Sequence, residues 1–393
     1  MNISLLLSVV CGWIGGAVLA AEVEAGASLA PQFVQLPGKP FGLAVSGDGN
    51  TVFVSLTIGQ SRIAVVKRSE KQYKLDRVAP LPAGPTGLAL THDGQILVVT
   101  MGESVALLDT TRLTSGSGDP LVAKFSDGNN AGSVYTNVTE DDKTLFVSDE
   151  GAEAISVIDL EKLRQDGNVD HAKIGKIPVG EAPIALTFSK DGRHLFTTSE
   201  IAADSWGWPD AVKPEGGGAG NRQIPEGAVV VVDVARAKTD PAQSVVARVP
   251  AGGSPVRMTI SPDGERLYVT ARGSNAALAF DAAKLVNDPE HARLSATTVG
   301  SAPVPVAVIQ GGKTLVVGNS NRFGADSGAA QFLTVLDTSK LGNSAAVIGT
   351  IKAGSFPREM RVSTDGSTLF VTNFNSSSLE IIDAQNPPLE RKD

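Results

Sequence analysis

The stretch from residue 255 to residue 281 decides the fold. It opens on Pro255 and an apolar run at 256–260, turns through Ser-Pro-Asp-Gly at 261–264, continues as Leu-Tyr-Val-Thr at 267–270 and ends as Ala-Leu-Ala-Phe-Asp at 277–281. The Asp-Gly pair supplies the positive φ that a tight hairpin turn requires. Short runs of β-branched and aromatic residues between Gly- and Pro-rich clusters are typical of strands. The stretch therefore predicts three consecutive antiparallel strands.

The same pattern returns about every 53 residues, seven times in all. Self-similarity of this kind indicates a repeat architecture. The seven units open at Pro40, Pro85, Val134, Pro183, Pro255, Pro303 and Pro357. Their second-strand motifs occupy 52–55, 97–100, 145–148, 195–198, 267–270, 315–318 and 369–372. Several of these runs are apolar at nearly every position, which indicates sheets covered on both faces, as in blades stacked around an axis.

Six of the units carry a fourth strand, but the seventh stops at Asp383. The segment Gln-Phe-Val-Gln-Leu at 32–36 precedes the first unit and has no other role. We expect it to complete the last blade and close the ring, because closure removes exposed sheet edges. The expected blades span 37–80, 81–125, 126–179, 180–250, 251–299, 300–352 and 353–383 plus 32–36.

The sequence thus predicts an all-β, seven-bladed β-propeller with four-stranded antiparallel blades, in one domain at 21–393. Leu-Tyr-Val-Thr-Ala at 267–271, Leu-Phe-Val-Thr-Asn at 369–373 and Ser-Pro-Asp-Gly at 261–264 resemble the YVTN-type seven-bladed β-propeller repeat family. The resemblance covers about residues 32–383. It implies kinship with bacterial surface and periplasmic propellers and with propeller lactonases. It does not assign a function, because fold alone does not carry one.

The first twenty residues have the pattern of an export signal. Residues 3–19 are apolar or small and uncharged, and Val-Leu-Ala at 18–20 offers small residues at the −3 and −1 positions of a cleavage site. We expect a signal peptide at 1–20 and a periplasmic or secreted protein. The alternative is a retained N-terminal anchor. The only cysteine, Cys11, lies inside this signal, so the mature chain has no disulfide, thiolate metal site or covalent haem motif.

Composition excludes other classes of protein. The 393 residues are 42% hydrophobic and 19% charged, which fits neither a disordered chain nor a polytopic membrane protein. The formal net charge of −8 argues against nucleic-acid binding, which needs a surplus of Lys and Arg.

Ligand sites are expected where the loops between strands two and three meet the starts of strands one, around the central channel. The enlarged loop at 199–227 holds Trp206, Trp208 and Arg222, and its Gly-rich run at 216–220 is expected to be mobile. The tryptophans predict either a stacking surface for a ligand or a plug that packs the loop onto the ring. We expect their truncation to weaken binding and to leave stability nearly unchanged.

Four arginines are expected near this mouth. Arg257 and Arg358 begin first strands, Arg272 follows a second strand, and Arg322 lies in the loop at 319–331. They predict an anion-binding ring, and the alternative is a set of salt bridges to nearby carboxylates.

Histidines are expected elsewhere. His92 lies in a hairpin turn, His194 begins a second strand, and His171 and His291 lie in third-to-fourth connections, all away from this face. We therefore predict neither a metal site nor a Ser-His-Asp triad.

The resemblance to propeller lactonases implies a Glu just after a second strand, with Arg and His at first-strand starts. Glu200 fits the Glu position, but the matching His and Arg are missing. We therefore expect a non-catalytic propeller, with no cofactor and no metal, that binds an unidentified protein or small molecule through its loop-bearing face. We expect a monomer that binds no nucleic acid and does not insert into a membrane after signal cleavage. The alternative is a lactonase-like hydrolase that uses Glu200 with the arginines.

Overall fold

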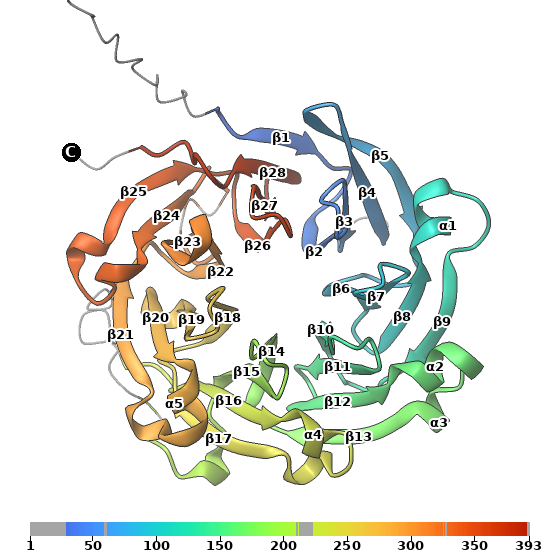
Figure 1. The fold of residues 1–393 in the computed structure, drawn as a ribbon, viewed down its shortest axis with the longest axis horizontal. Helices are drawn as coiled ribbons and strands as arrows, with labels where there is room; N and C mark the ends of the chain where they lie inside the picture. Colours follow the sequence, from blue (N-terminus) through green and yellow to red (C-terminus); the bar gives the residue numbers. More distant parts are fainter. Residues whose placement is uncertain are drawn as a thin grey trace, which may run out of the picture.

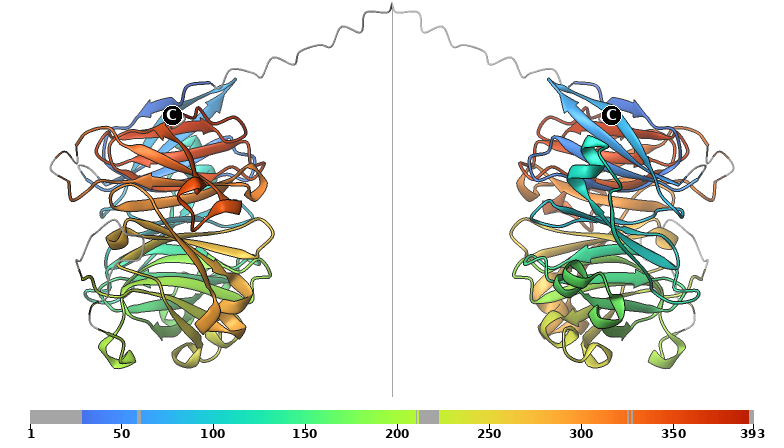
Figure 2. Two further views of the ribbon diagram at one scale, coloured as in Figure 1. Left: turned by 90° about the vertical axis from the view of Figure 1, so that its left-hand side faces the viewer. Right: turned by 90° about the vertical axis from the view of Figure 1, so that its right-hand side faces the viewer.

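The computed structural model describes residues 29–58, 61–209, 211, 223–324, 326 and 328–390. These residues form a ring of seven four-stranded antiparallel sheets around a central axis (Figure 1). Seen edge-on in Figure 2, the ring is a thick disc with connecting loops at both faces. The prediction of an all-β, seven-bladed propeller is confirmed.

In six blades the four strands follow chain order from the channel outward, and in blade seven the outer strand is the first strand of the chain. Blade one holds β2 (Pro40–Val45), β3 (Thr51–Leu56), β4 (Arg62–Ser69) and β5 (Gln72–Pro80). Blade two holds β6 (Leu88–Leu90), β7 (Ile96–Thr100), β8 (Ser104–Asp109) and β9 (Leu121–Ser126). Blade three holds β10 (Ser133–Val138), β11 (Thr144–Asp149), β12 (Ala154–Asp159) and β13 (Lys173–Pro178). Blade four holds β14 (Glu181–Phe188), β15 (His194–Ile201), β16 (Ala228–Asp233) and β17 (Val245–Pro250).

The remaining blades follow the same order. Blade five holds β18 (Pro255–Ile260), β19 (Arg266–Ala271), β20 (Ala276–Asp281) and β21 (Arg293–Thr298). Blade six holds β22 (Pro303–Ile309), β23 (Thr314–Asn319), β24 (Phe332–Asp337) and β25 (Val347–Lys352). Blade seven holds β26 (Pro357–Val362), β27 (Thr368–Asn373), β28 (Ser378–Asp383) and, from the other end of the chain, β1 (Gln32–Gln35).

Strand β1 closes the ring as the sequence predicts. It pairs antiparallel with β28, with Val34 opposite Leu379. Val34 and Leu36 are buried in a cluster that spans blades seven and one. The Gln32 side chain also exchanges two hydrogen bonds with the backbone of Tyr73 in blade one, at 2.6 and 3.0 Å. The strand therefore joins the last blade to the first.

The recurring Ser or Thr at the end of the second-strand motif links neighbouring blades. In four blades its buried hydroxyl donates to a carbonyl in, or just before, the inner strand of the next blade, with oxygen–oxygen distances between 2.6 and 3.1 Å. These bonds run from Ser55 to Thr86, from Ser148 to Ile184, from Thr270 to Val304 and from Thr372 to Phe41. The last of them spans the ring closure. The motif thus encodes blade packing as well as strand formation.

The Asp-Gly turns have the predicted backbone. Gly49, Gly264 and Gly366 have φ values of 71°, 82° and 70°. In blade three the same position is Asp142, with φ 54°. Three unit starts differ from the prediction: β6 begins at Leu88 rather than Pro85, and β14 begins at Glu181 rather than Pro183. In blade three, Ser133 faces Asp149 as Pro255 faces Ala271, so the unit opens one residue before the predicted Val134. The cause is the missing proline at this position.

Short helices connect third to fourth strands. They are α1 (Thr110–Ser115), α2 (Leu160–Asp166), α3 (Val169–Ala172), α4 (Val234–Ala237) and α5 (Ala282–Asn287). An Asp at the end of the third strand caps α1, α2, α4 and α5 by accepting from the backbone of the third residue that follows it. Across the described residues, none of the helices has the length and apolar character needed to traverse a bilayer.

Candidate functional site: an arginine cluster at the channel mouth

One position of the inner strands separates blade seven from the others. The residue after the opening Pro or Ser is uncharged in six blades, and Ile184, Val256 and Val304 pack there in an apolar cluster with Phe356. In blade seven it is Arg358. The strand register shifts between Pro357 and Glu359, so Arg358 stands at a bulge. A charged side chain thus replaces a hydrophobic one at the loop-bearing mouth of the channel.

Arg358 is held by aromatic rings. Its guanidinium carbon lies 3.9 Å from the ring centroid of Phe41 and 5.6 Å from that of Phe356. Its Nε is enclosed, and no described residue accepts a hydrogen bond from it. Nor does any described carboxylate form an ion pair with it. Stacking on aromatic faces positions the group but leaves its charge without a counter-ion.

The electrostatic surroundings of Arg358 disfavour its charge. Burial, and then the nearby charges of Arg257, Arg322 and Arg272, lower the pKa of Arg358 to about 9. The four arginines predicted from the sequence therefore lie close enough to repel one another. We call Arg257, Arg272, Arg322 and Arg358 the arginine mouth.

Two members of the arginine mouth come from the loops that follow second strands. Arg272 lies directly after β19 and donates through Nη2 to Glu200 at the end of β15. Its enclosed Nε finds no acceptor among the described residues. Arg322 stacks on Phe323 and Phe356, with its guanidinium carbon 5.2 and 5.6 Å from their ring centroids. The Phe323 side chain is 71% exposed. An exposed aromatic residue beside two arginines is a surface suited to a ligand with an anionic and an apolar part.

The fourth member, Arg257, belongs to a layer that crosses the channel below the mouth. Its Nε donates to Glu359 at 2.8 Å, and its guanidinium carbon lies 4.9 Å from the ring centroid of Tyr135. Arg361 donates from below to both Glu359 and the Tyr135 hydroxyl. Tyr135 in turn donates to Glu359 at 3.1 Å. We call Tyr135, Arg257, Glu359 and Arg361 the channel plug.

Cations outnumber anions around the axis. The arginine mouth and Arg361 bring five guanidiniums, while Glu200 and Glu359 are the carboxylates in direct contact with them among the described residues. Burial alone would raise the pKa of Glu359, but Arg361 and Arg257 outweigh it and hold that pKa below its usual value. The exposed Glu150 also attracts Arg272 from a greater distance. The residual positive charge makes the mouth a candidate anion site.

Glu200 lies in this cluster, but as an ion-pair partner. Burial raises its pKa, and the charge of Arg272 opposes that rise. Its carboxylate is directed to Arg272, and only 12% of the side chain is exposed. Both features of the alternative hypothesis, the Glu and the arginines, are therefore brought together in one place.

The structure separates the tryptophans from the arginines. Trp206 and Trp208 pack edge to face at 5.3 Å, and the guanidinium carbon of Arg248 lies 5.0 Å from the ring centroid of Trp206. Arg248 belongs to β17, an outer strand, and both indoles pack against the core between blades three and four. Arg257, by contrast, is engaged in the channel plug. The two predicted binding features therefore occupy different parts of the disc.

Several predictions fall outside the described residues. They concern Arg222, the Gly-rich run at 216–220 and the signal at 1–20.

The histidines sit where the sequence places them. His92, in a strand one–two turn, approaches Glu140 at 3.2 Å and Asp142 at 2.9 Å. His291 lies 2.8 Å from Asp288 in the connection after α5. Within the described ranges, no three His, Cys, Asp or Glu side chains converge as a metal site would require.

Sequence reasoning missed the channel plug as a unit. A signal exists in the repeat itself. The position occupied by Tyr135, Arg257 and Glu359 is otherwise Gly, Ala or Pro in the seven aligned inner strands. At the position of Arg361 the other blades carry Ala, Thr or Asn. Large or charged residues at positions that are otherwise small mark the places where the chain departs from pure repeat packing.

Comparisons with known proteins agree with the fold and extend no further. No protein-family model matches the chain, and no curated protein sequence matches it. Among solved structures, hydrazine synthase from Kuenenia stuttgartiensis is similar, with a TM-score of 0.66 and 19% sequence identity. The alignment covers 95% of this chain and 100% of that one. At this identity the likeness shows a shared propeller fold alone.

Proposed function

We propose that this protein is a non-catalytic binding propeller that captures an anionic group of a small molecule or protein partner at the arginine mouth. The observation that carries the proposal is Arg358. It replaces an apolar residue, it has no carboxylate partner among the described residues, and burial among three other arginines lowers its pKa to about 9. An arrangement that costs the free protein stability is accounted for if a ligand supplies the missing negative charge.

The proposal includes export and kinship with YVTN-type propellers. Export rests on the uncharged apolar segment at 3–19 and the Val-Leu-Ala site, and kinship rests on the Leu-Phe-Val-Thr-type motifs. We expect mature protein to begin at Ala21, in the periplasm or outside the cell. Intact-mass measurement on exported protein tests this, and recovery of membrane-bound protein that retains Met1 would contradict it.

Anion titration tests the binding site. Calorimetry with citrate and with inorganic phosphate measures affinity in wild-type protein and in Arg358→Met, which keeps much of the side-chain length but removes the charge. We expect wild-type protein to bind at least one of the two anions, and the variant to bind it about tenfold or more weakly, the usual loss when a charge-assisted contact is removed. Arg112→Gln is the matched control, because it removes an arginine that is 54% exposed and far from the channel.

The melting temperatures of wild-type protein and Arg358→Met are measured beside their anion affinities. We expect Arg358→Met to melt at or above the wild-type temperature, because it relieves repulsion within the arginine mouth. Equal anion affinity in wild type, Arg358→Met and Arg112→Gln would overturn the proposal.

The alternative function is lactone hydrolysis. It is favoured by the proximity of buried Glu200 to Arg272, and disfavoured by the ion pair that already engages this carboxylate. A panel of aliphatic and aromatic lactones, assayed with wild-type protein and Glu200→Gln, separates the two functions. Hydrolysis that disappears in a folded Glu200→Gln variant would establish the hydrolase and overturn the non-catalytic assignment.

A further inference from the structure

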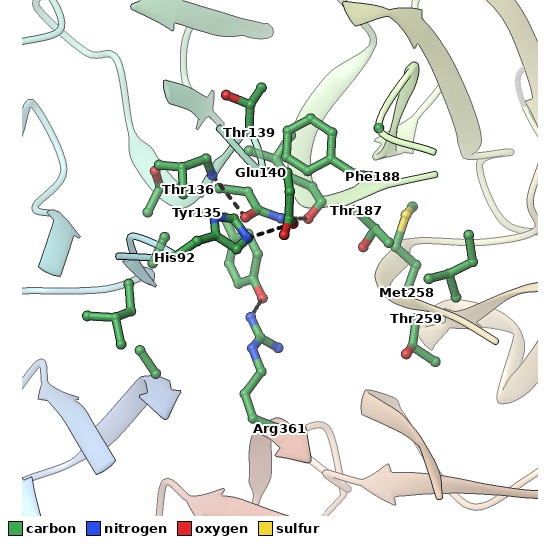
Figure 3. Close-up of a pocket in the computed structure, with 18 of the residues that line it drawn as sticks. His92, Tyr135, Thr136, Thr139, Glu140, Thr187, Phe188, Met258, Thr259 and Arg361 are labelled. Carbon is green, nitrogen blue, oxygen red and sulfur yellow. Dashed lines mark hydrogen bonds and ion pairs between the residues drawn. The ribbon is translucent and has the colours of Figure 1, made fainter. Parts of the chain in front are cut away.

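The channel also opens at the opposite mouth, where the turns between strands one and two lie. A cavity of about 810 Å³ occupies this end (Figure 3). Tyr135 and Arg361 of the channel plug form its inner end, and His92 and Glu140 belong to the turns at its rim. Its volume lies in the range of small-molecule sites, about 300–1,000 Å³. We call it the turn-side cavity.

The wall of the turn-side cavity combines apolar and polar side chains. One position of the inner strands contributes Ala44, Ala89, Asn137, Thr187, Thr259 and Arg361, and leucine, valine and isoleucine side chains, with Phe188 and Met258, line much of the rest. The alanines leave space, and Thr187 and Thr259 present hydroxyls for which no described residue provides a hydrogen-bond partner. Asn137 donates one amide hydrogen to Leu186 at 3.1 Å and retains another. Such a wall suits a ligand that carries several hydroxyl groups.

Arg361 supplies one directional cation at the inner end. Its Nη1 donates to Glu359 and to the Met360 carbonyl, and one Nη2 hydrogen goes to Tyr135. The Nε–H has no acceptor among the described residues, and 38% of the side chain is exposed. The Nε–Nη2 edge of a guanidinium matches the two oxygens of a carboxylate. Glu359 balances only one of the two arginines that contact it, Arg257 and Arg361, so the inner end keeps a net positive charge, while Glu140, Lys190 and Asp191 lie in the turns at the rim.

We propose that the turn-side cavity binds a small polyhydroxylated acid. Its carboxylate lies on the Nε–Nη2 edge of Arg361, and its hydroxyls exchange hydrogen bonds with Thr187, Thr259 and Asn137. This site is distinct from the arginine mouth, because the channel plug stands between the two ends of the channel. The proposal therefore goes beyond the proposed function and does not depend on it.

Calorimetric titration with D-gluconate, D-glucose and D-glucose 6-phosphate tests the site. We expect wild-type protein to bind one gluconate and to give no measurable binding of neutral glucose. The double variant Thr187→Val/Thr259→Val preserves side-chain shape and removes two hydroxyls, so it should bind gluconate about tenfold more weakly. Arg361→Lys keeps the charge but loses the paired donors, and it should weaken binding by a similar factor.

Arg112→Gln is the control, since it removes an arginine that is 54% exposed and far from the channel, and it should leave gluconate affinity unchanged. Arg322→Gln reports separately on any gluconate bound at the arginine mouth. If Arg361→Lys fails to fold, the threonine pair decides alone, because these side chains make no described hydrogen bonds. The proposal is overturned if gluconate does not bind at millimolar concentration, or if glucose binds equally well. It is also overturned if glucose 6-phosphate alone binds, or if Arg322→Gln abolishes gluconate binding while the threonine variant preserves it.

Discussion

The hairpin turns and the arginine mouth use charged side chains in opposite ways. In the turns, an Asp accepts from a Ser hydroxyl and from backbone amides within five residues, and these bonds lower the pKa of Asp48 and bring that of Asp365 to about 2. At the arginine mouth, burial lowers the pKa of Arg358 to about 9. The turn environment favours the charged form, whereas the mouth opposes it. Charges that recur in many blades therefore stabilise the fold, and charges that occur once are the candidates for binding.

Removing β1, the strand that closes the ring of repeats, should give the largest loss of stability. A chain that begins at residue 37 loses the four-residue ladder to β28, buried Val34 and Leu36, and the Gln32 bonds to Tyr73. Two buried side chains alone account for about 3–6 kcal/mol. Because the edge of β28 becomes unpaired, we expect a lower melting temperature and self-association. Calorimetry and size-exclusion chromatography measure both, and a monomer with the wild-type melting temperature would show that β1 does not close the ring.

That prediction rests on what the sequence reveals best. Periodicity fixes strands, blades and even the missing fourth strand, because each unit must satisfy the same backbone and burial constraints. The convergence of Arg257, Arg272, Arg322 and Arg358 was also predictable, since first-strand starts and second-strand ends meet at one face. The channel plug could not be predicted, because it depends on a bulge that separates Arg358 from Glu359 and on contacts across the axis. The position of the loop that holds Trp206 could not be predicted either, because the repeat does not constrain an insertion.

Among single substitutions of charged residues that occur in one blade only, Glu359→Gln should give the largest loss of stability. It leaves two guanidiniums, Arg257 and Arg361, without their shared counter-charge, and breaking a buried pair in this way costs about 3–5 kcal/mol. Arg257→Met should cost less, because Glu359 then keeps Arg361. Denaturant unfolding of both variants and of the double variant measures this. A double variant as unstable as the sum of the two single ones would show that the pair contributes nothing.

Glu380→Gln tests how a buried charge that occurs in one blade only makes stability depend on pH. Glu380 on β28 is buried, burial raises its pKa to about 7, and it accepts from Asn373 at 2.8 Å. A folded-state pKa above the unfolded value of about 4.3 means that protonation stabilises the protein below pH 4 and that this contribution is lost as pH rises through 7.

The glutamine variant should therefore match wild type at pH 4 and exceed it by on the order of 3 kcal/mol at pH 8. Unfolding curves at the two pH values measure the difference. Glu161→Gln, an exposed substitution on α2, serves as the control and should shift neither curve. A glutamine variant that is less stable than wild type at pH 8 would mean that the charged carboxylate is the stabilising form.

The smallest loss of stability is expected at the tryptophans. Its test shows whether the outer edge of the disc and the channel mouth are separate sites. From the sequence alone, Trp206→Ala should weaken binding and spare stability. The packing of Trp206 under Arg248 and against the core of blades three and four predicts the reverse. A half-buried indole with one cation–π contact contributes about 1–2 kcal/mol, so the variant should unfold slightly earlier, while citrate or phosphate affinity stays within about twofold of wild type. Trp206→Phe keeps an aromatic face for Arg248 and should recover most of the stability.

Intrinsic fluorescence of mature protein reports on Trp206 and Trp208 directly, so the tryptophan fluorescence should change little during an anion titration. A large fluorescence change on anion binding, or an affinity loss in Trp206→Ala at unchanged stability, would instead mean that the loop carries the indoles to the ligand and that rim and axis form one site.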